Sequence, residues 1–477
     1  MYRPIGTRRS LGVMGAGFVL FLAACGTQGT SPSEAAESSE PEASASAASG
    51  EVVEIEWFVG LGTGENEEQI PTEEAVVAAF NEANPNIHLT LTVVDNTEAA
   101  TTLAARLPSD PPDIIGPIGI RGLQSFGDQL LDIGPYIESS GVDLSEIPQA
   151  LIDVYNVDGK QIGIPMAVYP SFIYYNKSLF DEAQLAYPPH EVGEQYEGQD
   201  WTWEVLRDLA LQLTVDANGN DATSAEFDPE NVEVYGLDAQ FTENDTRAWS
   251  TIFGGSGSVV ADDGSTAQWP DNWRHGLQFF YDGIWVDHII PNQTAVQALA
   301  DGNTFQSGLV AMDVVHQWYT CCVYPGEGDP PVTDWDIAVL PVGPDGVITS
   351  KLHADTIGIL DSTEHPDEAF EVLRFLAASP ELTQVWGALP AIENQRDAFF
   401  AGLDERFTPL EIDWNVSTQM LEYPDNPSHE AFMPSFDEAD SANKDFGSRL
   451  WNTAGLDLAA EIDAHVQLLQ GIFDEGT

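Results

Sequence analysis

A glycine-rich loop, Gly60-Leu61-Gly62-Thr63-Gly64, follows the first apolar run of the chain and has a composition that suits ligand binding. Loops of this kind hold a phosphate with their backbone N–H groups when Gly-Lys-Ser/Thr closes them. That closing triplet is missing here, and the chain has no Lys or Arg between Val52 and Arg106. The loop therefore predicts close approach of the backbone at Gly60 and Leu61 to an uncharged ligand.

A second segment, Asp216-Ala-Asn218-Gly-Asn220, has the spacing of acidic and amide side chains found in calcium-binding loops. Such a loop needs a bidentate Glu at its twelfth position. Phe227 stands there instead. The spacing therefore favours a surface turn held by Asn and Asp side chains, and the sequence predicts neither a metal ion nor a cofactor.

Thiol chemistry is limited to Cys321 and Cys322, which are adjacent, because the third cysteine, Cys25, lies in the leader segment. Neighbouring Cα atoms lie about 3.8 Å apart, below the range of about 4.4–6.8 Å that disulfides usually span. A bridge between Cys321 and Cys322 would therefore be strained, although an oxidising compartment allows it. The sequence leaves the vicinal disulfide and two free thiols open as alternatives.

The leader has the order of an export signal, with Arg3, Arg8 and Arg9 ahead of an apolar run from Leu11 to Leu22. That run is too short to span a membrane stably. Leu22-Ala-Ala-Cys25 matches the lipobox of bacterial lipoproteins, so residues 1–25 are predicted to be a lipoprotein signal peptide and Cys25 the lipidated first residue of the mature chain. An ordinary signal peptide is the alternative, and the twin-arginine and general export routes both stay open.

Residues 26–50 consist almost entirely of Ser, Ala, Glu, Pro, Gly and Thr. Because they offer no apolar surface to bury, we expect them to form a disordered tether. The rest of the chain is long enough for two lobes or one large domain, and a hydrophobic content of 43% is that of a globular protein.

The net charge excludes one class of partner. The chain has 16 Lys and Arg against 78 Asp and Glu; three arginines leave with the leader, so the mature chain has 13 basic residues and a net charge of −65. A field of this sign repels phosphate backbones, so nucleic acid is not expected as a partner. We interpret the charge as a solvated acidic surface suited to a salty or acidic medium, which says nothing about the ligand.

The elements that position the glycine-rich loop alternate between strands and helices. Strands are predicted over 52–59, 87–94 and 111–115, with helices over about 71–83 and ending near 107. This order indicates a largely parallel sheet, which binds ligands beyond the carboxyl ends of its strands. Those ends are predicted at 59–63 and 116–121.

The centre of the chain, from Gly159 to Leu206, predicts two strands and a helix. A first strand is expected to stop at Pro165, because Pro cannot donate to a sheet ladder. A second strand is predicted from Ser171 to Tyr175. Thr202 is positioned to cap a helix that continues to Leu213.

Several segments carry a resemblance to a known family. They are Phe80-Asn-Glu-Ala-Asn-Pro-Asn-Ile87, Pro112-Asp-Ile114, the G-x-x-x-G-x-P pattern of residues 159–165, Tyr174-Tyr-Asn-Lys177 and the F-x-x-G-x-x-A-M pattern of residues 305–312. Together they resemble family 1 extracellular solute-binding proteins, the maltose-binding type that serves bacterial ABC importers. Each pattern is weak alone, but jointly they extend from about residue 52 to 470.

The resemblance implies an α/β fold of the periplasmic-binding-protein-like type II, with two discontinuous lobes joined by three hinge crossings. The N-terminal lobe is expected to be 51–168 plus 356–379, and the C-terminal lobe 169–355 plus 380–477. It also implies a non-enzymatic, monomeric receptor, lipid-anchored on the outer face of the cytoplasmic membrane. That receptor would capture a mono- or oligosaccharide between its lobes and deliver it to ABC permease subunits.

Sugars bind between flat aromatic rings and planar hydrogen-bonding groups, and the resemblance implies where such side chains meet the ligand. The positions are Tyr169 at the first crossing, Trp249 at a helix start, Trp318 at a strand end, His353 and Asp355 at the second crossing, Arg121 after the third strand, and Trp386 over the cleft. Core packing is the alternative for Tyr169, Trp249 and Trp318. A surface salt bridge is the alternative for Arg121, and a structural turn for His353 and Asp355.

Other functions stay open at this point. A receptor of the same fold could bind a polyamine or quaternary amine with an aromatic cage and carboxylates. A surface glycoside hydrolase needs only a pair of carboxylates, but with 78 acidic residues a chance pair carries no information. An adhesin would lack hinge closure.

Overall fold

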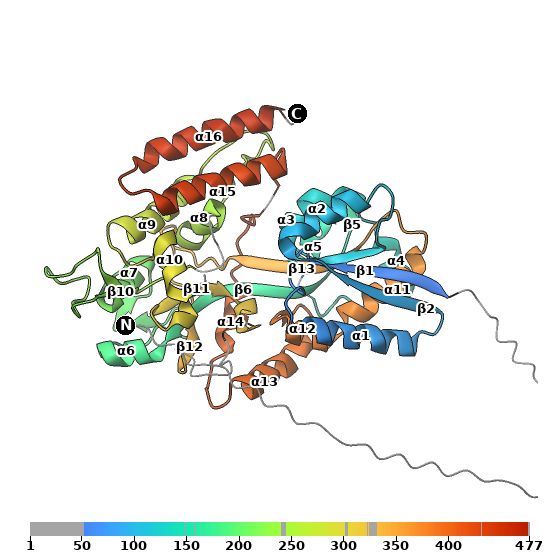
Figure 1. Ribbon diagram of the computed structural model, residues 1–477, viewed down its shortest axis with the longest axis horizontal. Coiled ribbons are helices and arrows are strands. Elements are labelled where there is room, and N and C mark those ends of the chain that lie inside the picture. Colours follow the sequence, from blue (N-terminus) through green and yellow to red (C-terminus); the bar gives the residue numbers. More distant parts are fainter. Residues whose placement is uncertain are drawn as a thin grey trace, which may run out of the picture. The chain divides into compact units, whose positions relative to one another are not determined.

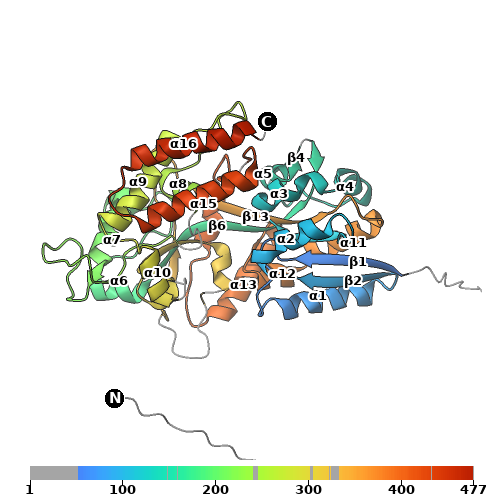
Figure 2. The ribbon, with the colours of Figure 1, turned by 45° about the horizontal axis from the view of Figure 1, so that its top comes forward.

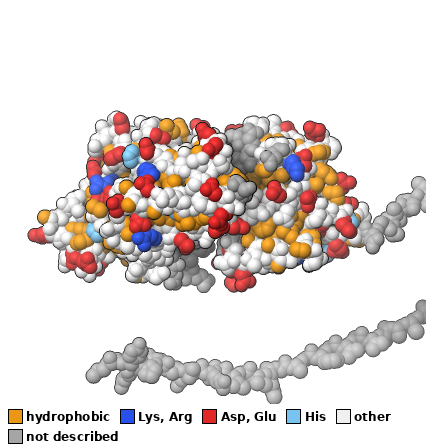
Figure 3. Space-filling view, turned by 90° about the horizontal axis from the view of Figure 1, so that it is seen from above, with side chains coloured by type: hydrophobic (Ala, Val, Ile, Leu, Met, Phe, Trp, Pro, Cys, Tyr) orange, Lys and Arg blue, Asp and Glu red, His pale blue; other side chains and the backbone are white. Residues whose placement is uncertain are grey.

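The computed structural model describes residues 52–475, apart from 148, 158, 240–244, 301–303, 322, 324–331 and 431. The predicted signal peptide, Cys25 and the predicted tether lie outside the described residues. Within the described ranges, no helix has both the length and the apolar content needed to cross a membrane. Figure 3 shows acidic side chains spread over the visible face, with few basic ones among them, in keeping with the composition.

The first strands and helices follow the predicted order. They are β1 (Val53–Val59), α1 (Ile70–Ala83), β2 (Ile87–Val93), α2 (Asn96–Arg106) and β3 (Ile114–Ile118). Strand β1 pairs in parallel with both β2 and β3, which confirms the predicted parallel arrangement. Figures 1 and 2 show α1 and α2 on opposite sides of this sheet. The buried α1 residues Val76, Val77 and Phe80 attach that helix to the sheet.

One long strand, β6 (Ile164–Asn176), connects two groups of elements. Its first half pairs antiparallel with β13 (Leu352–Ile359) and β14 (Leu389–Pro390). Its second half pairs with β11 (Met312–His316) and β12 (Trp335–Ala338). Strands β6 and β13 run side by side through the middle of Figure 1. We call the elements around β1–β3 the first half and those around β11 and β12 the second half.

The prediction that Pro165 ends a strand is wrong. Pro165 pairs with Thr356 near the start of β6, where the register of β13 is irregular. Pro170 is the last residue that pairs with β13, and the next residue, Ser171, pairs with β11. Both prolines therefore sit where the ladder starts or changes partner, and there the missing N–H is tolerated.

Helices dominate the second half (Figure 1). They include α7 (Trp203–Leu213), α8 (Thr246–Gly254), α9 (Asp271–Trp285), α10 (Gln293–Ala300), α15 (Phe436–Asn452) and α16 (Leu458–Glu475). The predicted cap of α7 is confirmed, because the Thr202 hydroxyl accepts from Val205 N at 3.3 Å. A turn at Gly455, with φ of 72°, separates α15 from α16.

Shorter elements complete the chain. The helices are α3 (Ile120–Phe126), α4 (Gly134–Ser140), α5 (Gln149–Val154), α6 (Lys177–Ala183), α11 (Pro366–Ala377), α12 (Pro380–Val385), α13 (Arg396–Phe407) and α14 (Asn415–Met420). The strands are β4 (Asn156–Val157), β5 (Lys160–Gln161), β7 (Gln195–Tyr196), β8 (Gln199–Asp200), β9 (Val215–Asp216) and β10 (Val232–Val234). The 3₁₀ turns are Gly127–Gln129, Phe305–Ser307, Gln317–Cys321 and Glu393–Gln395.

Candidate functional site

A cavity of about 510 Å³ has walls from both halves of the protein. The first half contributes residues after β1, from α2 and from α3; the second half contributes the start of α8 and much of α15. Strand β13 and the segment after α14 provide the rest. The described residues on its wall are Leu61, Gly62, Asn96, Ala100, Gly119, Gly122, Ser125, Phe126, Asp245, Ala248, Lys351, His353, Asp355, His429, Glu430, Phe436, Asp437, Asp440 and Lys444.

The loops after β1 and β3 pack against one carboxylate, that of Asp355. A Cβ added at Gly62 would lie 3.3 Å from Asp355 Oδ2, and one added at Gly119 would lie 3.0 Å from Asp355 Oδ1. Both glycines therefore allow the backbone to come close to the carboxylate. In the structure this backbone therefore packs against an acidic side chain of β13, and its close approach to an uncharged ligand stays a prediction.

Asp355 is 8% exposed, and burial raises the pKa of its carboxyl to about 7, with the charge on Glu430 adding to the rise. Near neutral pH this group is therefore present in both protonation states. A protonated carboxyl donates a hydrogen bond and an ionised one accepts, so Asp355 can serve a hydroxyl in either role.

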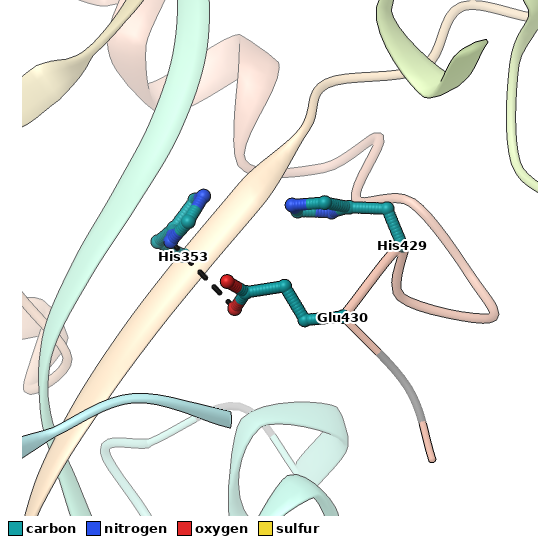
Figure 4. A group of neighbouring side chains, drawn as sticks. All are labelled: His353, His429 and Glu430. Carbon is teal, nitrogen blue, oxygen red and sulfur yellow. Dashed lines mark ion pairs between the residues drawn. The ribbon is translucent and has the colours of Figure 1, made fainter. Parts of the chain in front are cut away.

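Three histidines and two carboxylates lie behind and beside Asp355. His353 Nδ1 is 3.7 Å from Glu430 Oε2, and its ring meets that of His316 edge-on at 4.4 Å between centroids. His429 Nδ1 lies 2.7 Å from Asp425 Oδ2. Burial lowers the pKa of His353 to about 4, so its imidazole is neutral at neutral pH. Figure 4 shows the side chains of His353, His429 and Glu430 turned toward one another.

The opposite wall holds carboxylates that a buried arginine supports. Asp245 caps α8 by accepting from Arg247 N at 3.0 Å and Ala248 N at 3.3 Å. Arg247 is fully buried and its Nη2 donates to Asp440 Oδ1 at 3.2 Å. Lys444 Nζ lies 3.2 Å from the other oxygen of Asp440. The arrangement fixes two acceptor groups on the cavity wall, and the buried guanidinium is paired with carboxylates, although its Nε and Nη1 have no hydrogen-bond partner among the described residues.

The structure brings three of the predicted site residues to the cavity: Leu61, His353 and Asp355. Gly60 precedes the wall and has a φ of 134°, and a Cβ added there would lie 2.1 Å from the Val94 carbonyl oxygen, so only glycine fits at this position. The side chain of Arg121, in α3, lies outside the described residues.

The predicted aromatic residues lie in the core or behind the residues that form the cavity wall. Tyr169 is 2% exposed and pairs with His353 in the sheet register. Trp318 stacks on His316, which in turn contacts His353. Trp249 stacks on Phe280 with centroids 3.9 Å apart. The described wall residues include no Trp or Tyr, and their aromatic carbocycles are Phe126 and Phe436.

Trp386 is also buried, and its Nε1 donates to Glu73 Oε1 at 2.8 Å. Burial raises the pKa of Glu73 to about 7, while the bond from Trp386 lowers it. The folded state therefore holds a proton on Glu73 between about pH 4.5 and 7, where the unfolded chain has lost it. Stability from this group is present below pH 4.5 and is lost as the pH rises through 7.

Glu73→Gln removes this pH dependence. Relative to the wild type, we expect the free energy of unfolding of the variant to rise by about 3 kcal/mol between pH 4.5 and 8, measured by urea unfolding. Glu74→Gln, at the exposed neighbouring position, is the control and should leave the wild-type profile unchanged. Parallel curves for Glu73→Gln and wild type would refute the buried proton.

Cys321 is disulfide-bonded in the structure, while Cys322 lies outside the described residues. The predicted surface turn at Asp216 has the expected form, because its carboxylate accepts from the backbone N–H groups of Asn218, Asn220 and Asp228.

A family model described as bacterial extracellular solute-binding protein matches residues 64–381, about two thirds of the chain. The chain belongs to this family. The match confirms the resemblance found in the sequence, and it places the protein among extracellular proteins that bind solutes.

Proteins similar to this solute-binding protein are also named for the binding of substrates or sugars. A multiple sugar-binding protein from Streptococcus mutans is 30% identical over 189 residues, which are 39% of this chain and 38% of that protein. An ABC substrate-binding protein from Listeria monocytogenes, solved with cycloalternan, has a TM-score of 0.69 at 18% identity, covering 88% of this chain and 99% of its own. The sugar-binding protein MalE from Xanthomonas citri has a TM-score of 0.65 at 18% identity, covering 89% and 98%.

These likenesses establish the predicted α/β fold of periplasmic-binding-protein type II. The family and its structural neighbours bind substrates and are not enzymes. Much of the cavity wall of this solute-binding protein escaped the sequence analysis: Asp245, Lys351, His429, Glu430, Phe436, Asp437, Asp440 and Lys444. His429 and Glu430 are adjacent and follow Asn426-Pro427, and this pair was a sequence signal that could have indicated the wall.

Proposed function

We propose that this protein is the lipid-anchored, extracellular receptor of an ABC importer, and that it captures a mono- or oligosaccharide in the cavity. The observation that carries the proposal is a cavity whose hydrogen-bonding walls come from both halves that β6 connects. Its volume of about 510 Å³ falls in the range of about 300–1,000 Å³ typical of small-molecule sites. Relatives named for sugars support the choice of ligand.

The wall has the groups that a carbohydrate needs. Asp355, Asp440 and Asn96 present acceptors and donors to ring hydroxyls. Phe126, from the first half, and Phe436, from the second, offer flat apolar surfaces to the C–H faces of a sugar ring. Recognition then uses phenylalanine rings where the sequence had suggested tryptophans.

Binding of the solute would be coupled to a movement of the two halves relative to each other. We propose the lobe bounds 51–168 plus 356–379 and 169–355 plus 380–477, with β6 and β13 as two of the crossings and the third between 379 and 380. A solute that contacts both walls would favour the closed arrangement, because only there are all its contacts made. The permease subunits would recognise that arrangement.

Lipid anchoring through Cys25 belongs to the same proposal and rests on the lipobox at 22–25. Metabolic labelling with a fatty acid tests it. Label that persists in a Cys25→Ser chain would contradict the anchor.

A cationic solute is the second candidate, because carboxylates outnumber amines on the wall. The described wall residues include two lysines and five acidic residues, which are Asp245, Asp355, Glu430, Asp437 and Asp440. Such a lining favours a polyamine or a quaternary amine.

Calorimetry and thermal unfolding with a panel of neutral saccharides, spermidine and betaine separate the two candidates. We expect saturable binding of a saccharide, with the folded state stabilised by about 2.7 kcal/mol at a hundredfold excess over Kd. Asp355→Asn should weaken that binding about tenfold or more, since it removes the ionised form of the carboxyl, which is the stronger acceptor. Asp361→Asn, on the surface beyond β13, is the control.

If the protein binds spermidine or betaine and responds to no saccharide, the proposed carbohydrate ligand is wrong and the cationic solute takes its place. Equal affinities of the Asp355→Asn and wild-type proteins for the solute would show that the solute does not bind at Asp355 in this cavity.

A further inference from the structure

We propose that His353, His429 and Glu430 bind one divalent transition-metal ion, such as Zn²⁺, on the wall of the cavity. One ligand atom from each of the three residues can be chosen so that all lie within 4.8 Å of one another. Figure 4 shows His353 on β13 and the other two on the segment after α14, with their side chains converging. In a tetrahedral zinc site with bonds of about 2.0–2.1 Å, ligand atoms lie roughly 3.4 Å apart. Side-chain shifts on the order of 1 Å therefore suffice.

The surroundings of His429 fix which of its nitrogens is free. The Asp425 carboxylate lies 2.7 Å from His429 Nδ1 and accepts from the His429 backbone N–H at 2.8 Å. Its other oxygen accepts from Leu352 N at 3.0 Å, which ties the carboxylate to the start of β13. A histidine whose Nδ1–H donates to a carboxylate has its Nε2 lone pair left for a metal, and metal-binding histidines have this arrangement as a rule.

His353 lacks a hydrogen-bonding explanation of its own. Its Nε2 is buried and has no hydrogen-bond partner, and its Nδ1 is 3.7 Å from Glu430, beyond hydrogen-bond distance. A buried polar atom without a partner costs free energy. A metal ion bound at this Nε2 would remove that cost, and it would also neutralise the Glu430 carboxylate, whose side chain is 7% exposed.

The charges and openness of the site suit a cation with one free position. Asp355, Asp425 and Glu430 place carboxylates around it, and Lys351, which is 2% exposed on the same wall, opposes them with a single positive charge. The His353 side chain is 30% exposed, whereas that of His429 is 1% exposed. Two imidazoles and a carboxylate with an open side form a three-ligand zinc site whose fourth position faces the cavity. A water or a ligand oxygen would fill it.

The inference goes beyond the proposed solute binding and is tested without any solute. Tag-free mature protein is treated with EDTA, dialysed, and titrated with ZnCl₂ by calorimetry in excess Mg²⁺, which occupies the acidic surface. We expect one Zn²⁺ per chain, and a Co²⁺-loaded sample should show the visible absorption of a four-coordinate site. His429→Ala and Glu430→Gln should each weaken Zn²⁺ binding by about tenfold or more.

His275→Ala is the matched control, because His275 is exposed on α9. Unfolding curves show whether a variant is folded, and His353→Gln replaces any variant that is not. Absence of Zn²⁺ binding at micromolar concentrations would overturn the proposal. So would a Zn²⁺ affinity that survives both His429→Ala and Glu430→Gln. Neither result bears on saccharide binding, which is measured separately in EDTA.

Discussion

Replacing Arg247 with methionine is expected to lower the free energy of unfolding by about 3–5 kcal/mol. The Arg247 side chain is 1% exposed and lies between two elements of the second half. Its Nη2 donates to Asp440 on α15 at 3.2 Å, and its Nε lies 4.0 Å from Asp245 at the start of α8. Methionine keeps most of the volume but removes the charge. The loss is large because the Asp440 carboxylate, 8% exposed, loses its buried cation and keeps only the partly exposed Lys444.

An exposed pair provides the matched control. Arg274 Nη2 lies 2.7 Å from Asp463 Oδ1, and these side chains are 33% and 62% exposed. Because water already solvates both groups, Arg274→Met should cost less than about 1 kcal/mol. Urea unfolding of both variants gives the comparison. Equal losses for the two would show that burial does not strengthen the Arg247 contact.

The fold was predictable wherever local pattern and packing agree. The strand predicted over 52–59 and the helix predicted over about 71–83 each had one consistent interpretation, and both are confirmed. The prediction that Pro165 ends a strand was wrong because a propensity argument considers one strand at a time. Whether Pro165 can stay in the sheet depends on its pairing with β13, which is nearly 200 residues away in the sequence.

Site residues were predictable only where the course of the backbone alone brings them to the cavity. Leu61 and Asp355 reach the cavity because the end of β1 and the crossing strand β13 must meet there. Phe436 and Asp440 belong to a late helix, and no pattern in that helix indicates which of its faces meets α3. Whether a tryptophan faces a core or a cavity depends on its neighbours in space, and the residue type is the same in both cases.

A variant of Trp249 can test whether this tryptophan belongs to the core or faces the cavity. Trp249→Ala is expected to cost about 3–5 kcal/mol of stability, because it empties a buried site where the indole stacks on Phe280 at 3.9 Å and 18°. Phe436→Ala, at a half-buried position on the cavity wall, should cost much less stability. It should weaken saccharide binding about tenfold instead, the value of one aromatic contact.

The two variants therefore separate packing from recognition when each is tested for both properties. Affinity is measured by calorimetry at a temperature where unfolding curves show each variant to be folded, so that a loss of folded protein is not counted as a loss of binding. Folded Trp249→Ala should keep the wild-type affinity, because Phe280 and Trp451 surround the indole and the cavity wall does not include it. A tenfold weaker affinity with unchanged stability would instead put Trp249 in contact with the solute, and it would require α8 to present a different face to the cavity.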